Sequence, residues 1–238
     1  MNSEIVSDYT GLVKNDETYG GVAGWYYVKN GKVDFTYTGL VKHDAEYGGK
    51  AGWYYVVNGK ADFTITDVVY NPGTYGVAGW WYVKNAKVDF SYTGLVKHSA
   101  NYGGVAGWYY VTNAKVDFSV SGLVYNPGTY GTEGWWYVKN ACVDFTFTGL
   151  FRGADGDWYY IKHGALQDSV EGLVFNNGTY GVRGWWYVKN GKVQFGYTGA
   201  ASNANGTWFV KNGMVDFSYS GNVTIAGKTY TVKNGQVQ

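Results

Sequence analysis

Residues 24–35 read GWYYVKNGKVDF, and this stretch decides the fold of the 238-residue chain. Asn30-Gly31 lies between runs of aromatic and β-branched residues. That pattern predicts a β-hairpin, because a two-residue type I′ turn needs positive φ at both positions. Counting outward from the turn pairs Val28 with Val33, Tyr27 with Asp34, Tyr26 with Phe35 and Trp25 with Thr36. Opposed residues share a face of the hairpin. The alternation therefore predicts an apolar core face made of Tyr26, Val28, Val33 and Phe35. The opposite, outward face is predicted to carry Trp25, Tyr27, Asp34 and Thr36.

The hairpin motif recurs along the whole chain. Its turns are centred near residues 30, 58, 85, 113, 140, 163, 190, 212 and 234. A short fixed period indicates a repeat architecture, because one hairpin cannot bury its own apolar face and must stack on a neighbour. No segment has the three-and-four spacing of apolar residues that predicts a helix. We therefore predict an all-β, repetitive β-hairpin solenoid of about nine stacked repeats, forming a single array over residues 1–238. A closed barrel or sandwich is less favoured, because the intervals between repeats vary while the motif stays constant.

Composition excludes several classes of function. The net charge is +1 and there is no basic cluster, so we expect neither nucleic-acid binding nor attraction to an anionic membrane. Cys142 is the only cysteine, which excludes an intramolecular disulfide and a cysteine metal cluster. No apolar run reaches the roughly 18 residues of a membrane span. We expect a monomer with no cofactor, no metal and no membrane insertion.

The connectors between hairpins fall into two types. One reads KHDAEYGG at 42–49 and recurs as KHSANYGG at 97–104, and the other reads YNPGTYG at 70–76 and recurs at 125–131. Their alternation gives a 55-residue superperiod in the middle of the chain. His43 and His98 occupy equivalent connector positions about two repeats apart, so they are expected to be loop residues and not a shared metal or acid–base site.

The pattern Trp-Tyr-Tyr-Val-x-Asn-Gly-x-Val followed by a Gly-led connector resembles the choline-binding and glucan-binding repeats of Gram-positive surface proteins. It is closest to the longer GWYYVKNGKVDF arrays of gut anaerobes, and the resemblance extends over all nine units. It implies stacked β-hairpins and binding to a cell-wall polymer, to a glucan, or to a host protein such as an immunoglobulin. The family's choline cages use a second Trp after the connector glycine. That position here is aliphatic or polar: Leu12, Leu40, Val68, Leu95, Leu123, Leu150, Leu173, Ala200 and Asn222.

The predicted ligand-binding residues are the Trp, Tyr and Asp of the outward face in the first five repeats. A Trp face can stack on a sugar ring or anchor a protein, and a carboxylate can accept hydrogen bonds from hydroxyl groups. The alternative is that these aromatic side chains pack on the next connector and hold the stack together. We expect Trp81, Trp136 and Trp186 in the core. The candidate set is Trp25, Tyr27, Asp34, Trp53, Tyr55, Asp62, Trp80, Tyr82, Asp89, Trp108, Tyr110, Asp117, Trp135, Tyr137 and Asp144.

No catalytic residues are predicted. A glycosidase needs one pair of carboxylates in different environments, whereas the Asp residues here occur once per repeat in equivalent contexts. No nucleophile elbow or phosphate-binding glycine loop is present. The chain is therefore not expected to be an enzyme.

Two hypotheses for function remain open, beside a third possibility, a stalk that binds no ligand. The first is a non-catalytic, extracellular repeat module that binds cell-wall glycan or other polysaccharide through several weak sites. The second is a surface adhesin that binds a host glycoprotein such as an immunoglobulin through one or two differentiated repeats. Either places the chain outside a Gram-positive cell, secreted or on its surface. The first four residues do not form a signal peptide, so we expect a fragment of a longer protein that carries the export signal elsewhere.

Overall fold

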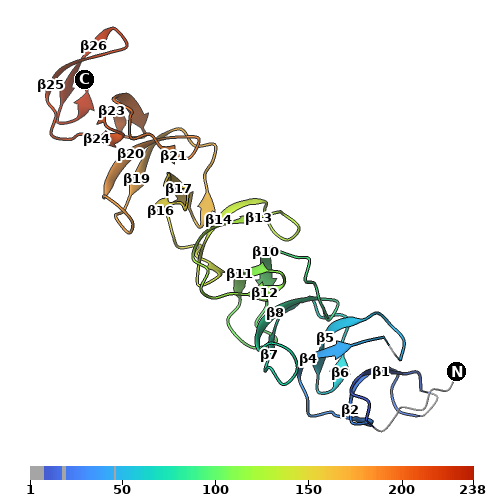
Figure 1. Cartoon of the computed structure of the whole chain (residues 1–238). Coiled ribbons are helices and arrows are strands. Elements are labelled where there is room, and N and C mark those ends of the chain that lie inside the picture. The colour runs from blue at the N-terminus through green and yellow to red at the C-terminus, as the bar shows by residue number, and fades with distance from the viewer. Residues whose placement is uncertain (1–7, 18–19, 46) are drawn as a thin grey trace. The chain divides into compact units, whose positions relative to one another are not determined.

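The computed structural model describes residues 8–17, 20–45 and 47–238, and these contain 27 strands and no helix (Figure 1). The all-β prediction is confirmed. Residues 1–7, which include the four N-terminal residues discussed above, and three residues of the first two connectors (18, 19 and 46) lie outside the described part. No helix long and apolar enough to cross a membrane occurs in the part that is described.

Each repeat has three strands, which we call the connector strand, the long strand and the short strand. The connector strands are β1 (Gly11–Asn15), β4 (Gly39–His43), β7 (Asp67–Asn71), β10 (Gly94–His98), β13 (Gly122–Asn126), β16 (Gly149–Arg152), β19 (Gly172–Asn176), β22 (Gly199–Asn203) and β25 (Gly221–Ile225). The long strands are β2 (Gly24–Lys29), β5 (Gly52–Val57), β8 (Gly79–Lys84), β11 (Gly107–Thr112), β14 (Gly134–Lys139), β17 (Trp158–Lys162), β20 (Gly184–Lys189), β23 (Gly206–Lys211) and β26 (Lys228–Lys233). The short strands are β3 (Lys32–Val33), β6 (Lys60–Ala61), β9 (Lys87–Val88), β12 (Lys115–Val116), β15 (Cys142–Val143), β18 (Ala165–Leu166), β21 (Lys192–Val193), β24 (Met214–Val215) and β27 (Gln236–Val237).

The predicted turns are confirmed at all nine positions. The first turn residue, Asn in eight repeats and His163 in the sixth, has φ between 47° and 52°. The second, Gly or Ala, has φ between 59° and 81°. Two successive positive φ values define the type I′ turn, whose twist matches that of the flanking strands. The Asn-Gly and Asn-Ala dipeptides therefore fix where each hairpin closes.

The predicted hairpin register holds only near the turn. Val28 pairs with Val33 and Lys29 with Lys32, and the Asp34 amide donates to the Tyr27 carbonyl at 3.0 Å. The predicted pairs Tyr26–Phe35 and Trp25–Thr36 are wrong, because β3 ends at Val33. Trp25 and Tyr26 pair instead with Ala61 and Lys60 of the next repeat.

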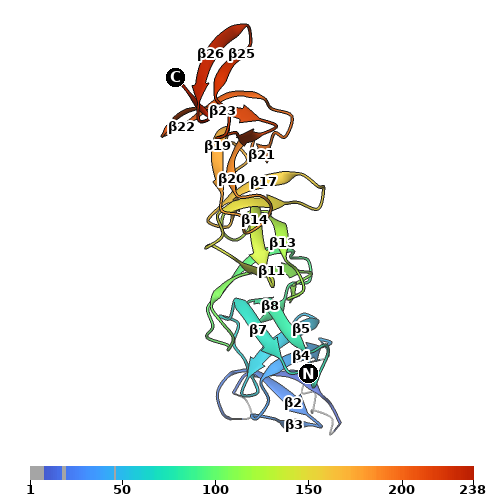
Figure 2. The ribbon, with the colours of Figure 1, turned by 90° about the vertical axis from the view of Figure 1, so that its left-hand side faces the viewer.

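The hairpins are stacked by this pairing between the long strand of one repeat and the short strand of the next. The same pairing joins β5 to β9, β8 to β12 and β11 to β15, and further along β14 to β18, β17 to β21, β20 to β24 and β23 to β27. The second turn residue adds two backbone hydrogen bonds between neighbouring repeats. The Gly59 carbonyl accepts from the Tyr27 amide at 2.7 Å, and the Gly59 amide donates to the Tyr37 carbonyl at 2.8 Å. Figure 2 shows β4, β5, β7 and β8 side by side in consecutive repeats. The predicted β-hairpin solenoid is confirmed.

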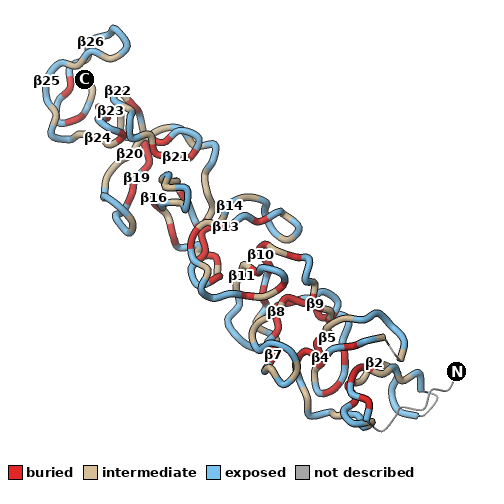
Figure 3. The backbone as a smooth tube through the Cα atoms, in the orientation of Figure 1, coloured by how far each residue is buried: buried red, intermediate tan, exposed pale blue. Residues whose placement is uncertain are grey.

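By its contacts, the chain divides into two compact units. The first comprises Met1–Val120, Asn126–Glu133 and Asn140–Cys142, and the second Ser121–Tyr125, Gly134–Lys139 and Val143–Gln238. In both units the buried residues follow the strands and most of the second turn residues, whereas the first turn residues and the connector tips are exposed (Figure 3). The valine or isoleucine that precedes the last residue of each long strand is fully or almost fully buried. The single array over residues 1–238 stays a prediction.

Substituting Gly59 by Ala is expected to destabilise the first unit by about 3 kcal/mol. A Cβ atom at Gly59 would lie 2.2 Å from the Asp34 carbonyl oxygen of the preceding repeat, so backbone would have to move. Ala86 occupies the same turn position one repeat later and is fully buried, so Ala86→Gly is the matched control. In Ala86→Gly, the loss of one buried methyl group destabilises the fold and the relief of a strained positive φ stabilises it. Each effect is worth about 1 kcal/mol, so the two nearly cancel. Thermal unfolding of both variants tests this, and equal melting temperatures would contradict it.

Candidate functional site

The predicted outward ladder of Trp, Tyr and Asp does not exist as one surface. Tyr27, Tyr55, Tyr82 and Tyr137 are only 1–3% exposed, and Tyr110 is half-buried. Trp25, Trp53, Trp80 and Trp108 are half-buried, whereas Trp135 is 47% exposed. Asp62 and Asp117 are exposed, and Asp34, Asp89 and Asp144 are half-buried. The prediction of an exposed Tyr is therefore wrong for the four buried residues.

Tyr27 shows why the face assignment fails. It lies opposite Leu12 of the connector strand, and its ring contacts Tyr37 at 5.1 Å and Tyr75 of a later connector at 5.7 Å. Burial raises the pKa of Tyr27 well above its usual range. Conversely Phe35, expected in the core, is 61% exposed. The core therefore lies between the long strand and the connectors, and not within the Asn-Gly hairpin.

The aspartates act as turn caps. Asp34 Oδ1 accepts from the Thr36 amide at 2.9 Å and from the Thr36 hydroxyl at 2.6 Å. The same pair of bonds recurs at Asp62–Thr64, Asp89–Ser91, Asp117–Ser119 and Asp144–Thr146. The hydroxyl bond is the main cause that lowers the pKa of Asp34, Asp62 and Asp117. This cap turns the chain away after the short strand, which is why the hairpin ladder stops at two pairs.

Three tryptophans each pack on the last glycine of a later connector. A Cβ at Gly49, Gly76 or Gly104 would lie within 2.7–2.8 Å of the ring of Trp25, Trp53 or Trp80 respectively. The same contact joins Trp108 to Gly131, and in the second unit Trp158 to Gly181. Only a residue without a side chain, at positive φ, allows this approach. Both connector types end in Tyr followed by one or two glycines, and the last glycine was the sequence signal for this contact.

This packing forms three equivalent aromatic pockets in the first unit, which we name after their tryptophans. The Trp25 pocket has a volume of about 220 Å³, and the Trp53 and Trp80 pockets about 200 Å³ each. Each takes one wall from the Trp and two walls from the next repeat, the second aromatic residue of the long strand and the Phe after the short strand. In chain order these wall pairs are Tyr54 and Phe63, Trp81 and Phe90, and Tyr109 and Phe118.

The walls stand edge to face. In the Trp80 pocket the ring centroids of Trp80 and His98 are 5.5 Å apart, those of His98 and Tyr109 5.8 Å, and those of Tyr109 and Phe118 6.2 Å. The polar tips of the second wall are already bonded: Tyr54 and Tyr109 donate to the carbonyls of Lys50 and Val105. Trp81 donates to Val77 in the same way. The pockets thus present ring faces and few free hydrogen-bonding groups.

Two further expectations are corrected by this geometry. Trp81, predicted as core, is half-buried and lines the Trp53 pocket. Trp136 and Trp186 are also half-buried. His43 and His98 are not loop residues: each ends a connector strand, is 2% exposed and lines a pocket. No group of three or more His, Cys, Asp or Glu side chains able to hold a metal occurs within the described residues.

Comparison with known proteins assigns the repeats. A family model described as choline-binding repeat matches residues 22–34, 36–62, 74–89, 91–117, 146–167, 182–194 and 196–216, together more than half of the chain. No curated protein matches. Among solved structures, choline binding protein F from Streptococcus pneumoniae is 18% identical over 92% of this chain and 71% of its own, with a TM-score of 0.40. Alternansucrase in complex with isomaltononaose is 16% identical over 96% of this chain, which spans only 16% of that enzyme, with a TM-score of 0.33. The matched repeats show that this chain belongs to the choline-binding repeat family.

Proposed function

We propose that this chain is a non-catalytic, extracellular module that binds a cell-wall polymer, or a related polysaccharide, through the pockets between its repeats. The observation that carries the proposal is the recurrence of one three-walled aromatic pocket at Trp25, Trp53 and Trp80. Turns and caps alone would not require the same cavity to be kept three times. In this proposal the chain is a monomeric array at a Gram-positive cell surface, or secreted.

The chemistry of the pockets indicates the kind of group they receive. About 200 Å³ is below the usual range of drug-sized sites, so each pocket accepts one small group. Aromatic faces attract a methylated ammonium group through their negative quadrupole, and they also stack on the apolar face of a sugar ring. Because the polar tips of the second wall are bonded internally, sugar hydroxyl groups gain little there. A methylated ammonium substituent on the polymer is therefore favoured over an unsubstituted sugar.

The third wall of each pocket supplies an aromatic side chain in place of the second Trp that the family's choline cages use. The sequence places Leu12, Leu40 and Val68 where those cages use a second Trp, and these residues line the bottom of the pockets. The aromatic side chain that completes the enclosure is instead the half-exposed Phe after the short strand. This Phe supports choline-type recognition by a different residue.

A second candidate, the host-protein adhesin, is supported by exposed valines on four connectors. Val22, Val77, Val105 and Val182 are 59–73% exposed at the tips of their connectors. Apolar side chains that face solvent there are available to contact a protein partner. An immunoglobulin is the partner class to test first.

One experiment separates the two candidates. The chain is mixed with purified Gram-positive cell walls that carry choline, in the presence of serum proteins, and then centrifuged. Pelleting with the walls and release by free choline are expected. A chain that stays in the supernatant with bound immunoglobulin would contradict the wall-binding proposal and support the adhesin, and one that binds neither would contradict both.

A further inference from the structure

The three pockets differ in the residue that ends the connector strand. The Trp53 pocket has Asn71, whose amide donates to the carbonyls of Tyr75 and Val77 and whose oxygen accepts from the Leu40 amide. The Trp25 pocket has His43, whose Nε2 lies 2.6 Å from the Gly48 carbonyl oxygen. Its Nδ1 is buried and has no hydrogen-bond partner in the described structure. One N–H is enough to satisfy the contacts of the His43 ring, and the Asn71 amide carries no charge.

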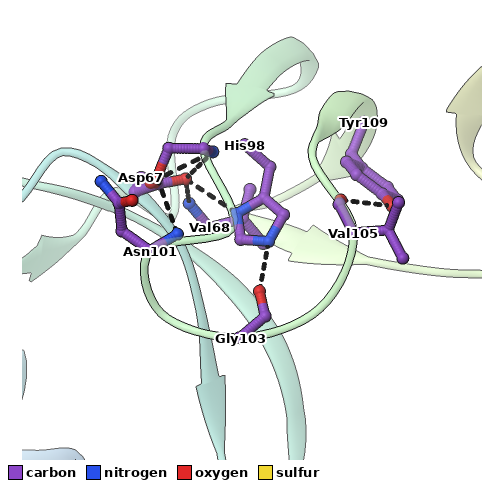
Figure 4. Close-up of polar contacts among 8 residues, drawn as sticks. Asp67, Val68, His98, Asn101, Gly103, Val105 and Tyr109 are labelled. Atoms are coloured by element: carbon purple, nitrogen blue, oxygen red, sulfur yellow. Dashed lines mark hydrogen bonds and ion pairs between the residues drawn. The ribbon is translucent and has the colours of Figure 1, made fainter.

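His98 in the Trp80 pocket is different, because both of its ring nitrogens face acceptors. Nδ1 lies 2.9 Å from Asp67 Oδ1, and Nε2 lies 2.7 Å from the Gly103 carbonyl oxygen (Figure 4). Neither a carboxylate nor a carbonyl can donate, so both nitrogens of His98 must carry hydrogen. The geometry therefore makes His98 an imidazolium cation.

Asp67 is held as the matching anion. Its Oδ1 also accepts from the Val68 amide at 2.7 Å, and its Oδ2 accepts from the Ser99 hydroxyl. The Ser99 amide donates to the same carboxylate at 3.2 Å. Every one of these groups donates to Asp67, which is the arrangement of a carboxylate that only accepts. The equivalent position in the preceding connector strand is Gly39, so the pair belongs to the Trp80 pocket and has no counterpart in the Trp53 pocket.

The order of the two charges matters for a ligand. His98 lines the pocket and contacts Trp80 and Tyr109, whereas Asp67 lies behind it and does not line the pocket. In Figure 4 the ring stands between Asp67 and the segment that carries Gly103 and Val105. A cation that enters the Trp80 pocket therefore meets the imidazolium first. The pair is almost fully buried, so solvent screens this repulsion little.

We propose that the Asp67–His98 ion pair makes the Trp80 pocket discriminate against cations, so that neighbouring pockets of one chain receive different groups. The Trp53 pocket takes a methylated ammonium, and the Trp80 pocket takes an uncharged ring such as a sugar. This inference rests on the proposed function of the pockets as binding sites. It makes His98 a specificity-determining residue, and Asp67 the residue that positions it.

The test compares choline with its uncharged isostere 3,3-dimethylbutan-1-ol. The full chain is labelled with 5-fluorotryptophan, and the fluorine resonances of Trp53 and Trp80 are followed in separate titrations. The ratio of choline affinity to isostere affinity is expected to be roughly ten-fold lower in the Trp80 pocket than in the Trp53 pocket. Nitrogen shifts of the imidazoles check the cause without any ligand: His98 should show two protonated nitrogens and His43 one.

A double variant, Asp67→Gly with His98→Asn, is the matched control. It installs in the Trp80 pocket the residues that stand at Gly39 and Asn71, so Asn at 98 can accept from the Val68 amide as Asn71 does from Leu40. In this variant, the ratio of choline affinity to isostere affinity in the Trp80 pocket should rise to the ratio in the Trp53 pocket. Equal ratios in the unmodified chain, or no change in the double variant, would overturn the inference alone. If neither ligand moves either resonance, the proposed function fails as well.

Discussion

Replacing Phe63, Phe90 and Phe118 together by Ser is expected to weaken binding to the wall polymer by about a thousand-fold. Each side chain is the third wall of one pocket. Losing one aromatic wall costs about ten-fold per site, whether the wall faces a small cation or an uncharged ring. The three losses multiply because one polymer engages the pockets together. Half-maximal pelleting with choline-bearing walls measures the loss, and titration with free choline gives the ten-fold loss at the Trp25 and Trp53 pockets.

The same variant is expected to melt at a lower temperature but to stay folded at room temperature. The three phenylalanines are 41–48% exposed, so each removal uncovers about half of one side chain and costs about 1 to 2 kcal/mol. Phe35→Ser is the control: Phe35 has the same place in the first repeat, but no Trp precedes Trp25 in the chain to complete a pocket. Wall binding should survive Phe35→Ser. Unchanged binding by the triple variant would rule out the pockets as the binding sites.

Alkaline unfolding between about pH 10 and pH 12 is the second large effect we expect. Burial raises the pKa of Tyr37 and Tyr92 to about 12, and that of Tyr27, Tyr82 and Tyr137 further still. In the unfolded chain these phenols lose their protons near pH 10. The folded state then holds more protons than the unfolded one, so the free energy of unfolding falls as pH rises. Stability from these groups is complete below pH 10 and is lost as pH rises toward the folded pKa values.

Tyrosinate absorbance and circular dichroism, followed together during a pH titration, measure this transition. Ionisation and loss of structure should coincide. Tyr27→Phe and Tyr82→Phe offer a sharper test, because burial is the main cause that raises the pKa of both hydroxyl groups. Removing them deletes the titrating groups and should move the midpoint to higher pH. Smooth ionisation near pH 10 with the structure intact would contradict the expectation.

The repeat, its turns and its fold class could be predicted from sequence because they depend on local chemistry. Positive φ at Asn30 and Gly31 follows from the two residue types alone. The need to stack follows from the apolar surface of one hairpin. The pairing of Val28 with Val33 next to the turn could be predicted from the position of the turn alone.

The assignment of faces failed because it extended the ladder past the Asp34 cap. The hydroxyl at Thr36 competes with the strand, and the long strand then pairs with the next repeat. That competition is decided by a neighbour 25 or more residues away. The Trp–Gly packing that builds the pockets has the same origin, since Trp25 and Gly49 come from different repeats. Local patterns reveal that such a site is repeated, but not which residues of successive repeats meet.

The way the long strands are shared between neighbours has a mechanical consequence. Within each unit, every backbone ladder joins a repeat only to itself or to the next one. A pulling force on such a chain has no single clamp to break. It should unfold the hairpins one after another, and each event should release about 22 to 28 residues of unfolded chain. Under load in optical tweezers, the chain should therefore lengthen in a series of similar steps and dissipate the applied force gradually.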